Sequence, residues 1–501
     1  MGTGVGKEVF AAEDYARFRE RLEWCLGVLA GLLERPGFGA GPTTIGAELE
    51  LYLIDGEALP LWDNQAVRAA VADPRVNLEL DQFNLELNAT PVSLAGRPFA
   101  ALRAELEELL GRVGAAVAAQ VQGGRLALVG ILPTLRRTDL QLDAISDAAR
   151  YRALNHGLRR LRHDPFRIRI AGADRLDLAA DAVTVEGAAT SFQVHLRVDP
   201  DNFTRAYNAA QATSALVLAV AGNSPTFLGH RLWEETRVAL CKQSVDDRDG
   251  RGPRRQVARM ALGSGWLRGG PLAAFTESVR LYQPLLPVLS GNDPADDPGP
   301  GRRAPGLEEL RLHQSTVWRW NRAIYDPAGG GHLRIELRAL PAGPTIADML
   351  ANAALLIGLT RWLAGQDESW TRVLAFERAD HGFYRAAQHG LAARLDWPFT
   401  PTGQLAPRTR TLPAATLVLE LLPAAWEGLV SAGVASAEAD ELLGLIAARA
   451  RTGQTGAAWQ RHTLAVLEPR LGRERALAVM LECYLERAAT GQPVHTWPSC
   501  T

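Results

Sequence analysis

The chain has 501 residues, 47% of them hydrophobic and 22% charged, which is the composition of a globular protein with a large core. Its formal net charge of −2 and the spread of its basic residues along the chain exclude the massed positive charge of a nucleic-acid or acidic-membrane binder, so we expect a small-molecule partner. Lysine occurs only at Lys7 and Lys242, so any phosphate chemistry must depend on arginine, backbone amides or a metal ion.

The four cysteines lie far apart, at Cys25, Cys241, Cys483 and Cys500. They form no CxxC pair, so they suggest neither a disulfide framework nor a zinc ligand set, and a reducing cytoplasm fits them best. The N-terminus lacks the apolar segment of a signal peptide, and the most apolar stretches, such as 215–221, are shorter than a membrane span. We therefore expect a soluble, cytoplasmic protein that enters no membrane.

Apolar spacing predicts a long opening helix over 8–35, ended by the Pro–Gly stretch at 36–39. Strands are predicted from period-two alternation over 44–54, 76–88, 125–130, 191–198 and 332–340. Further helices are predicted over 99–119, 144–162, 202–221, 307–322, 344–364, 367–394, 414–430, 436–451 and 456–488. Strands separated by long helices, without a regular strand–helix–strand cadence, favour an α+β protein with one antiparallel sheet.

We expect a single domain over residues 1–501. Its predicted parts are an N-terminal helix in 1–43, a sheet core with helices in 44–365, a helical part in 366–490 and a tail in 491–501. The Pro/Gly-rich stretch over 290–306 is too polar and turn-rich to pack, and it is either a flap that closes over a site or a passive linker.

Four of the predicted strands alternate apolar side chains with polar ones. Successive side chains of a strand point to opposite faces of the sheet, so the alternation shows which residues share a face. The polar sets are Glu48 and Glu50; Asn84, Glu86 and Asn88; Gln193, His195 and Arg197; and Arg334, Glu336 and Arg338. If the four strands share a sheet, one of its faces gathers all these groups.

Two interpretations of this face are open. It is either the solvated face of an antiparallel sheet, which such alternation usually means, or a binding site. Glu and Asn are depleted in strands, and neighbouring carboxylates repel unless a cation lies between them. Mg²⁺ accepts carboxylate, phosphate and water oxygens, His195 offers a further ligand, and the arginines can pair with phosphate or a substrate carboxylate. The pattern therefore predicts a metal–nucleotide site.

Several motifs of other enzyme classes are absent from the sequence. It contains no GxxxxGK[ST], no GxGxxG that opens a helix after a strand, no GxSxG and no HExxH. The sequence therefore argues against four enzyme classes: P-loop phosphoryl transferases, dinucleotide-dependent redox enzymes, serine hydrolases and zinc proteases.

The strand motifs resemble the glutamate–cysteine ligase type 2 family of carboxylate–amine ligases in order and spacing. The segments that carry the resemblance are GAELELYLID (46–55), FNLELNATP (83–91), SFQVHLRVDP (191–200) and IELRALP (335–341), with further matches at 222–237, 313–322, 385–395 and 452–461. Because they span roughly the whole chain, the resemblance is to a complete protein and not to one module. It implies a glutamine-synthetase-like fold, in which a curved antiparallel sheet forms a funnel-shaped active site backed by helices.

The resemblance also implies roles for individual residues. The Mg²⁺ ligands would be Glu48, Glu50, Glu86, His195 and Glu336; the catalytic residues Glu48, Glu336 and Arg338; and the substrate- or nucleotide-binding residues Arg237, Arg334, Gln193, Asn84 and Arg322. Family members often have a more acidic first strand, GxEEE, where this chain has Ala47 and Leu49 beside Glu48. Either Glu79 or Asp81 could therefore complete the metal set.

A carboxylate is a poor electrophile, so joining it to an amine requires prior conversion of an oxygen to a leaving group. The expected function is an ATP- and Mg²⁺-dependent ligase that phosphorylates the side-chain carboxyl of glutamate and lets an amine such as cysteine attack, as in glutathione biosynthesis. The alternatives are phosphoryl transfer to a guanidino or other small acceptor on the same fold, and a non-catalytic nucleotide sensor. The sequence names neither acid nor amine, and it leaves open whether the chain forms a homo-oligomer.

Overall fold

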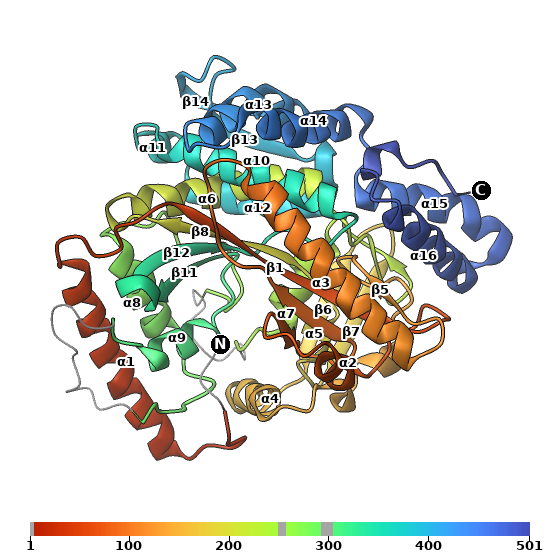
Figure 1. Cartoon of the computed structure of the whole chain (residues 1–501), viewed down its shortest axis with the longest axis horizontal. Helices are drawn as coiled ribbons and strands as arrows, with labels where there is room; N and C mark the ends of the chain where they lie inside the picture. Colours follow the sequence, from red (N-terminus) through yellow and green to blue (C-terminus); the bar gives the residue numbers. More distant parts are fainter. Residues whose placement is uncertain (1–4, 249–256, 292–303, 501) are drawn as a thin grey trace.

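A curved antiparallel sheet organises the fold (Figure 1). The computed structural model describes residues 5–248, 257–291 and 304–500, so most of the 290–306 stretch lies outside the described residues. Within them, eight strands form the sheet in the order β11-β12-β8-β1-β3-β2, and β4 and β5 also pair with β1. The strands are β1 (Thr44–Ile54), β2 (Val76–Leu78), β3 (Asn84–Asn88), β4 (Val92–Ser93), β5 (Arg125–Ala127), β8 (Phe192–Val198), β11 (Asn321–Asp326) and β12 (His332–Leu337). The polar strands predicted from sequence are thus four consecutive neighbours, β12-β8-β1-β3.

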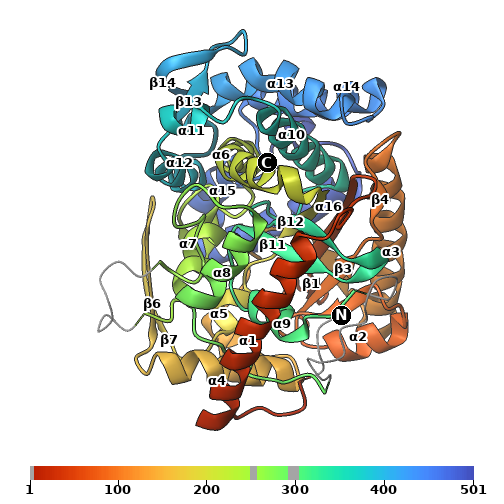
Figure 2. The same ribbon diagram turned by 90° about the vertical axis from the view of Figure 1, so that its left-hand side faces the viewer.

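The apolar face of the sheet is covered by the longest buried helices. The side chains that alternate with the polar ones, such as Leu49, Leu87, Val194 and Ile335, are all buried in the main core. Helices α3, α6 and α10 pack on this side, with α13 and α14 in a further layer behind α10 (Figure 2). Burial of one face only is the reason for the period-two pattern.

The helices surround the sheet on both sides. They are α1 (Ala12–Leu33), α2 (Asn64–Val71), α3 (Pro98–Gln120), α4 (Ala149–Leu161), α5 (Thr184–Gly187), α6 (Phe203–Ala221), α7 (Thr236–Ser244), α8 (Pro271–Leu281), α9 (Glu308–Gln314), α10 (Ile346–Ala364), α11 (Trp370–Val373), α12 (Phe376–His389), α13 (Ala414–Val430), α14 (Ser436–Thr452), α15 (Gly456–Leu471) and α16 (Arg473–Ala489). Helices α1, α4 and α9 lie on the polar side of the sheet (Figure 1).

Helix α10 is the one described helix long and apolar enough to span a membrane. A helix was expected over 344–364, but its apolar character was overlooked. Its most apolar window is 83% buried inside the fold, where the helix packs on α6 and α13. It is therefore the central helix of this protein's core.

Two of the predicted elements that contribute to the polar face are wrong in extent. The single strand expected over 76–88 is a hairpin of β2 and β3, because Asn64 binds the carbonyls of Asp81 and Asn84 and stabilises the turn between them. The helix expected over 307–322 ends at Gln314, and Arg322 lies instead on strand β11. Both errors arise because contacts with distant residues decide these boundaries, and the local periodicity of the sequence carries no information about such contacts.

Other features were missed by the sequence reading. Two separate hairpins, β6 (Phe166–Ala171) with β7 (Arg175–Ala180) and β13 (Arg394–Phe399) with β14 (Leu405–Pro413), lie in segments read as irregular or helical, and β9 (Thr226–Phe227) pairs with β10 (His230–Arg231). The helix expected over 456–488 is broken at Gly472 into α15 and α16.

The structure pairs Cys483 of α16 with Cys500, contrary to the expectation that the cysteines form no disulfide. The pairing is possible because the C-terminal tail folds back, where Trp497 packs edge-on against Trp459 and Tyr484. Cys25 and Cys241 are buried and unpaired.

Candidate active site

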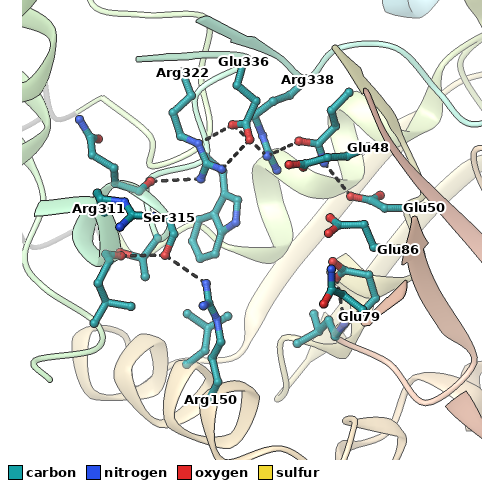
Figure 3. A pocket seen from close by; sticks show the side chains of 18 of the residues that line it. Glu48, Glu50, Glu79, Glu86, Arg150, Arg311, Ser315, Arg322, Glu336 and Arg338 are labelled. Atoms are coloured by element: carbon teal, nitrogen blue, oxygen red, sulfur yellow. Dashed lines mark hydrogen bonds and ion pairs between the residues drawn. The ribbon is translucent and has the colours of Figure 1, made fainter. Parts of the chain in front are cut away.

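A cavity of about 780 Å³ lies against the polar face of the sheet (Figure 3). Strands β1, β3, β11 and β12 supply one side, and residues of α4, α5 and α9 supply the other. The polar face is therefore enclosed by helices and is not a solvated surface, which decides between the two interpretations of the sequence pattern.

Three side chains converge on one point of this face, and we name them cluster A: Glu48, His195 and Glu336. Strand β8 lies between β1 and β12, with His195 directly opposite Glu336. The Nε2 atom of His195 lies 2.9 Å from Glu48 Oε1 and 3.8 Å from Glu336 Oε1. One ligand atom from each of the three residues lies within 4.8 Å of the others.

Arginines keep Glu336 ionised. Arg322, its cross-strand neighbour on β11, donates from Nε to one oxygen and from Nη2 to the other at 2.9 Å, and Arg338 Nη1 lies 3.3 Å away. Burial works against the charge of Glu336, but the two guanidinium groups and His195 outweigh it and lower its pKa. Burial likewise opposes ionisation of Glu48, and the charge of His195 nevertheless lowers the pKa of that carboxyl.

A second group, cluster B, consists of Glu50, Glu79 and Glu86. Glu50 on β1 lies directly opposite Glu86 on β3, and the β2–β3 turn brings Glu79 to the same point. Glu50 accepts hydrogen bonds from the backbone N of Ser191 at 2.6 Å and from Gln193 Nε2 at 2.8 Å. No ion pair with a basic side chain stabilises cluster B within the described residues.

The pKa values of the carboxyl groups in cluster B are raised, whereas those in cluster A are lowered. Burial, followed by the charges of Glu48 and Glu50, raises the pKa of Glu86 to about 8. Burial and the charges of Glu86 and Glu50 raise the pKa of Glu79 well above its ordinary value, and burial also raises that of Glu50. Three half-buried carboxylates held close together without a cation repel one another, so they have a strong tendency to take up protons or a metal ion.

Both clusters fit divalent cations. Cluster B offers carboxylate oxygens only, the donor set that Mg²⁺ prefers. In cluster A the histidine is buried, its Nε2 atom lies between the carboxylates of Glu48 and Glu336, and its Nδ1 atom makes no hydrogen bond within the described residues. A ring nitrogen aimed between two carboxylates is suited to a metal ligand.

The structure settles where Glu79 and Asp81 lie. Glu79 joins cluster B, whereas Asp81 is fully buried, lies against Gly187, and does not line the cavity. The sequence could not separate them because both lie in the turn between β2 and β3, whose direction the distant Asn64 helps to fix.

The remaining predicted residues divide into two groups. Gln193, Asn84, Arg322, Arg334 and Arg338 line the cavity. Arg338 Nη1 donates to Gln193 Oε1 at 2.5 Å, and so links the two clusters through Gln193. Arg237 is buried outside the cavity lining, where it binds Glu235 and donates to the carbonyl of Ala339.

The far side of the cavity contains residues that the sequence reading did not select. Arg150 of α4 donates to Ser315 Oγ at 3.1 Å, and Arg311 of α9 lies beside them, across the cavity from cluster B (Figure 3). Glu186 of α5 also lines the cavity. The sequence gave little indication of these cavity residues. It showed only that 144–162 is rich in arginine, and nothing in it places α4 and α9 opposite the sheet.

Comparison with protein families matches residues 44–476 to glutamate-cysteine ligase family 2. The chain belongs to this family. Glutamate–cysteine ligase family 2 is a family of ATP-dependent carbon–nitrogen ligases, so the chain is an enzyme of that class and the resemblance of its motifs is confirmed. Comparison with curated proteins gave no match.

The fold of this glutamate–cysteine ligase family member is similar to that of a solved ligase structure. A glutamate–cysteine ligase from Francisella tularensis in complex with AMP covers 89% of this chain and 89% of its own, with 11% identity and a TM-score of 0.56. A bifunctional glutathione synthetase from Pasteurella multocida, of which 55% is covered, has a TM-score of 0.43 at 11% identity and covers 93% of this chain. The ligase PafA in complex with Pup covers 87% of this chain and 71% of its own, with 9% identity and a TM-score of 0.39. The glutamine-synthetase-like fold with its curved antiparallel sheet is thereby confirmed.

Proposed function

We propose that the protein is a ligase that uses ATP and Mg²⁺ to join the side-chain carboxyl of glutamate to an amine such as cysteine, through an acyl phosphate. The observation that carries the proposal is the pair of metal-suited clusters on one sheet face, inside a cavity with an arginine at each end. The AMP bound in the Francisella ligase, which has the same fold, supports nucleotide use.

The donor set fits Mg²⁺ at both clusters, with Glu48, His195 and Glu336 at one and Glu50, Glu79 and Glu86 at the other. When bound, the metal supplies positive charge that neutralises phosphate oxygens. The protein's own contribution is to position two arginines. Arg338 is held by Glu336 and Gln193, and Arg322 is held by Glu336. Both guanidinium groups can therefore bind a phosphate or a carboxylate of a substrate in the cavity.

The opposite side of the cavity has a different charge. Arg150 and Arg311 give it positive charge away from the carboxylate clusters. A substrate with a second carboxylate, such as glutamate, could therefore be oriented between this side and the sheet. The cavity of about 780 Å³ is in the size range of small-molecule sites, which supports small substrates.

The proposal is tested by incubating the purified protein with ATP, Mg²⁺, glutamate and a panel of amines that includes cysteine. Release of ADP is followed, and the products are identified by mass spectrometry. An amide whose formation needs all four components supports the proposal. The variant Glu336→Gln removes a charge from cluster A and should abolish the product, while thermal unfolding checks that the variant is folded.

Other outcomes would identify the alternatives. ADP release without any amide, accompanied by a phosphorylated guanidino or other small acceptor, would show a kinase. Nucleotide binding with no turnover of any substrate would show a sensor. Either result overturns the ligase proposal.

A further inference from the structure

The Glu186 carboxylate faces the cavity without a protein partner. It is partly exposed on the cavity wall, and no hydrogen bond or ion pair involves it among the described residues. Each of the five carboxylates of clusters A and B, by contrast, accepts a hydrogen bond or forms an ion pair. Glu186 is therefore a negative group in the cavity that neither cluster uses.

The backbone that carries Glu186 is firmly held. The N–H of Val183 donates to Asn155 Oδ1 at 3.2 Å, and the hydroxyl of Thr184 donates to the carbonyl of Leu140 at 2.6 Å. Gly187 packs so closely on Asp81 that a Cβ there would come 2.3 Å from Asp81 Oδ2. These contacts fix the backbone of the turn, so the point from which the Glu186 side chain extends to the cavity is defined.

Glu186 lies close enough to cluster B for the charge of Glu50 to act on it, and its own charge acts on Glu79. Glu186 precedes by five positions Ser191, whose backbone N–H donates to Glu50 of cluster B. Burial, and next the charge of Glu50, raises the pKa of Glu186 to about 7, while Arg338 and Arg237 act in the opposite direction. The charged groups coupled to it on the surrounding elements are Glu50, Glu79, Asp81, Arg237 and Arg338.

An amine in neutral water is largely an ammonium ion, which cannot attack a carbonyl carbon until it loses a proton. The described cavity contains several arginines, none of which can attract an ammonium or accept a proton. The carboxylates of the two clusters are paired with protein groups or suited to metal ions. Glu308 of α9 also lines the cavity, but it has an interaction partner in the structure. Glu186 is therefore the lining carboxylate that has no hydrogen bond or ion pair among the described residues and can receive the amine.

We propose that Glu186 binds the ammonium group of the second substrate and accepts its proton, which makes Glu186 a catalytic residue for the amine half of the reaction. This rests on the proposed ligase function. One N–H bond of the ammonium group breaks and its proton passes to a Glu186 oxygen, which frees the nitrogen lone pair to form the C–N bond. The C–O bond to the phosphate then breaks, and its electron pair leaves with the phosphate, which takes up the second proton that the nitrogen loses as the amide forms. The substrate class is a primary amine that is protonated at neutral pH.

The test compares two nucleophiles in the variant Glu186→Gln. Cysteine is an ammonium substrate, whereas hydroxylamine is already neutral at pH 7 and needs neither an anionic binding group nor a base. With cysteine, kcat/KM should fall by about 100-fold or more, while ATP-dependent hydroxamate formation with hydroxylamine stays within about threefold of wild type. Glu186→Asp, which keeps the charge, should recover part of the cysteine reaction. Glu234→Gln, a carboxylate outside the cavity that pairs with Arg461, serves as the matched control and should leave both reactions unchanged.

The outcomes separate this inference from the proposed function. If the wild type forms neither amide nor hydroxamate, the ligase proposal falls and the inference falls with it. If the wild type forms both, an equal loss of both reactions in Glu186→Gln shows a structural role and overturns the inference alone. An unchanged cysteine reaction in that variant overturns it as well.

Discussion

Glu50 and Glu86 occupy directly opposite positions on the antiparallel strands β1 and β3. Opposed like charges destabilise a strand pair, and here the third carboxylate of cluster B, Glu79, lies close by. No basic side chain forms an ion pair with them within the part of the chain that the structure describes, and only Glu50 is partly offset by the charges of Arg338 and Arg237. The folded protein thus contains a site whose stability depends on what binds there.

Glu86→Gln should stabilise the metal-free protein and weaken its binding of Mg²⁺. Glutamine is neutral without taking up a proton, so the free energy of unfolding in EDTA at neutral pH is expected to rise by about 1 kcal/mol. Loss of a ligand oxygen should lower Mg²⁺ affinity at least about tenfold. Chemical denaturation and calorimetric titration measure the two effects. Glu57→Gln, an exposed loop carboxylate, is the control and should change neither. Lower stability of Glu86→Gln in EDTA would contradict the role assigned to cluster B.

The stability of the metal-free protein should fall as pH rises across neutrality. The pKa of Glu86 is raised from its ordinary value of 4.5 to about 8, so the folded state holds a proton that the unfolded chain releases more readily. The stability provided by this proton is complete below pH 4.5 and is lost as pH rises through about 8. Urea denaturation in EDTA at about pH 6 and about pH 8.5 measures the difference. Mg²⁺ should reduce this difference in unfolding free energy between the two pH values, because the cation replaces the proton. An equal pH dependence with and without Mg²⁺ would argue against a metal at cluster B.

Arg322 and Arg334 allow a matched comparison of two cavity arginines. Arg322 has a 12% exposed side chain and two hydrogen bonds to the buried Glu336, while Arg334 is 27% exposed and pairs with Asp326. Arg322→Met should cost about 3–5 kcal/mol of unfolding free energy, because it removes the arginine that binds both oxygens of the buried Glu336 carboxylate. Arg334→Met should cost about 0–1 kcal/mol. Denaturant unfolding in EDTA distinguishes them; equal costs would mean that Glu336 is not held by Arg322.

Gly187→Ala tests the close contact that positions α5. The added methyl group would come 2.3 Å from Asp81 Oδ2, so either the turn or the β2–β3 hairpin must move. We expect a loss of about 1–3 kcal/mol in unfolding free energy. Activity with ammonium substrates should also fall, because Glu186 is the adjacent residue. Gly265→Ala, where nothing lies within 4 Å of the new Cβ, is the control for thermal unfolding and for amide formation. A fully stable Gly187→Ala would show that Asp81 can give way at little cost.

Much of the sheet could be predicted from the sequence, because burial of one face makes apolar and polar residues alternate along each strand. That alternation identified the polar residues of β1, β3, β8 and β12, and these strands are consecutive neighbours. The same signal was present in FRIRIA (166–171) and RLDLAA (175–180), so the β6–β7 hairpin could have been predicted. The β13–β14 hairpin offered less, because its exposed residues follow no regular alternation.

Errors at the site have a different origin. Arg237 carries a family motif, but its side chain turns to Glu235 and the backbone of Ala339 and does not reach the cavity lining. Arg322 was placed at the end of a predicted helix and lies on a strand, where its register opposite Glu336 creates the ion pair. Motif and periodicity identify a residue type at a position; they do not give the direction of its side chain.

The sequence by itself determined which side chains share a face, because alternation along a strand is a local property of the backbone. It also determined the donor types, and so the preference for a divalent cation. Only the tertiary structure decided that Glu79 and not Asp81 joins Glu50 and Glu86, that the face is enclosed by α4, α5 and α9, and that Glu186 faces the cavity unpaired. These facts depend on the turn between β2 and β3 and on the packing of distant helices, which arise from contacts between residues far apart in the chain.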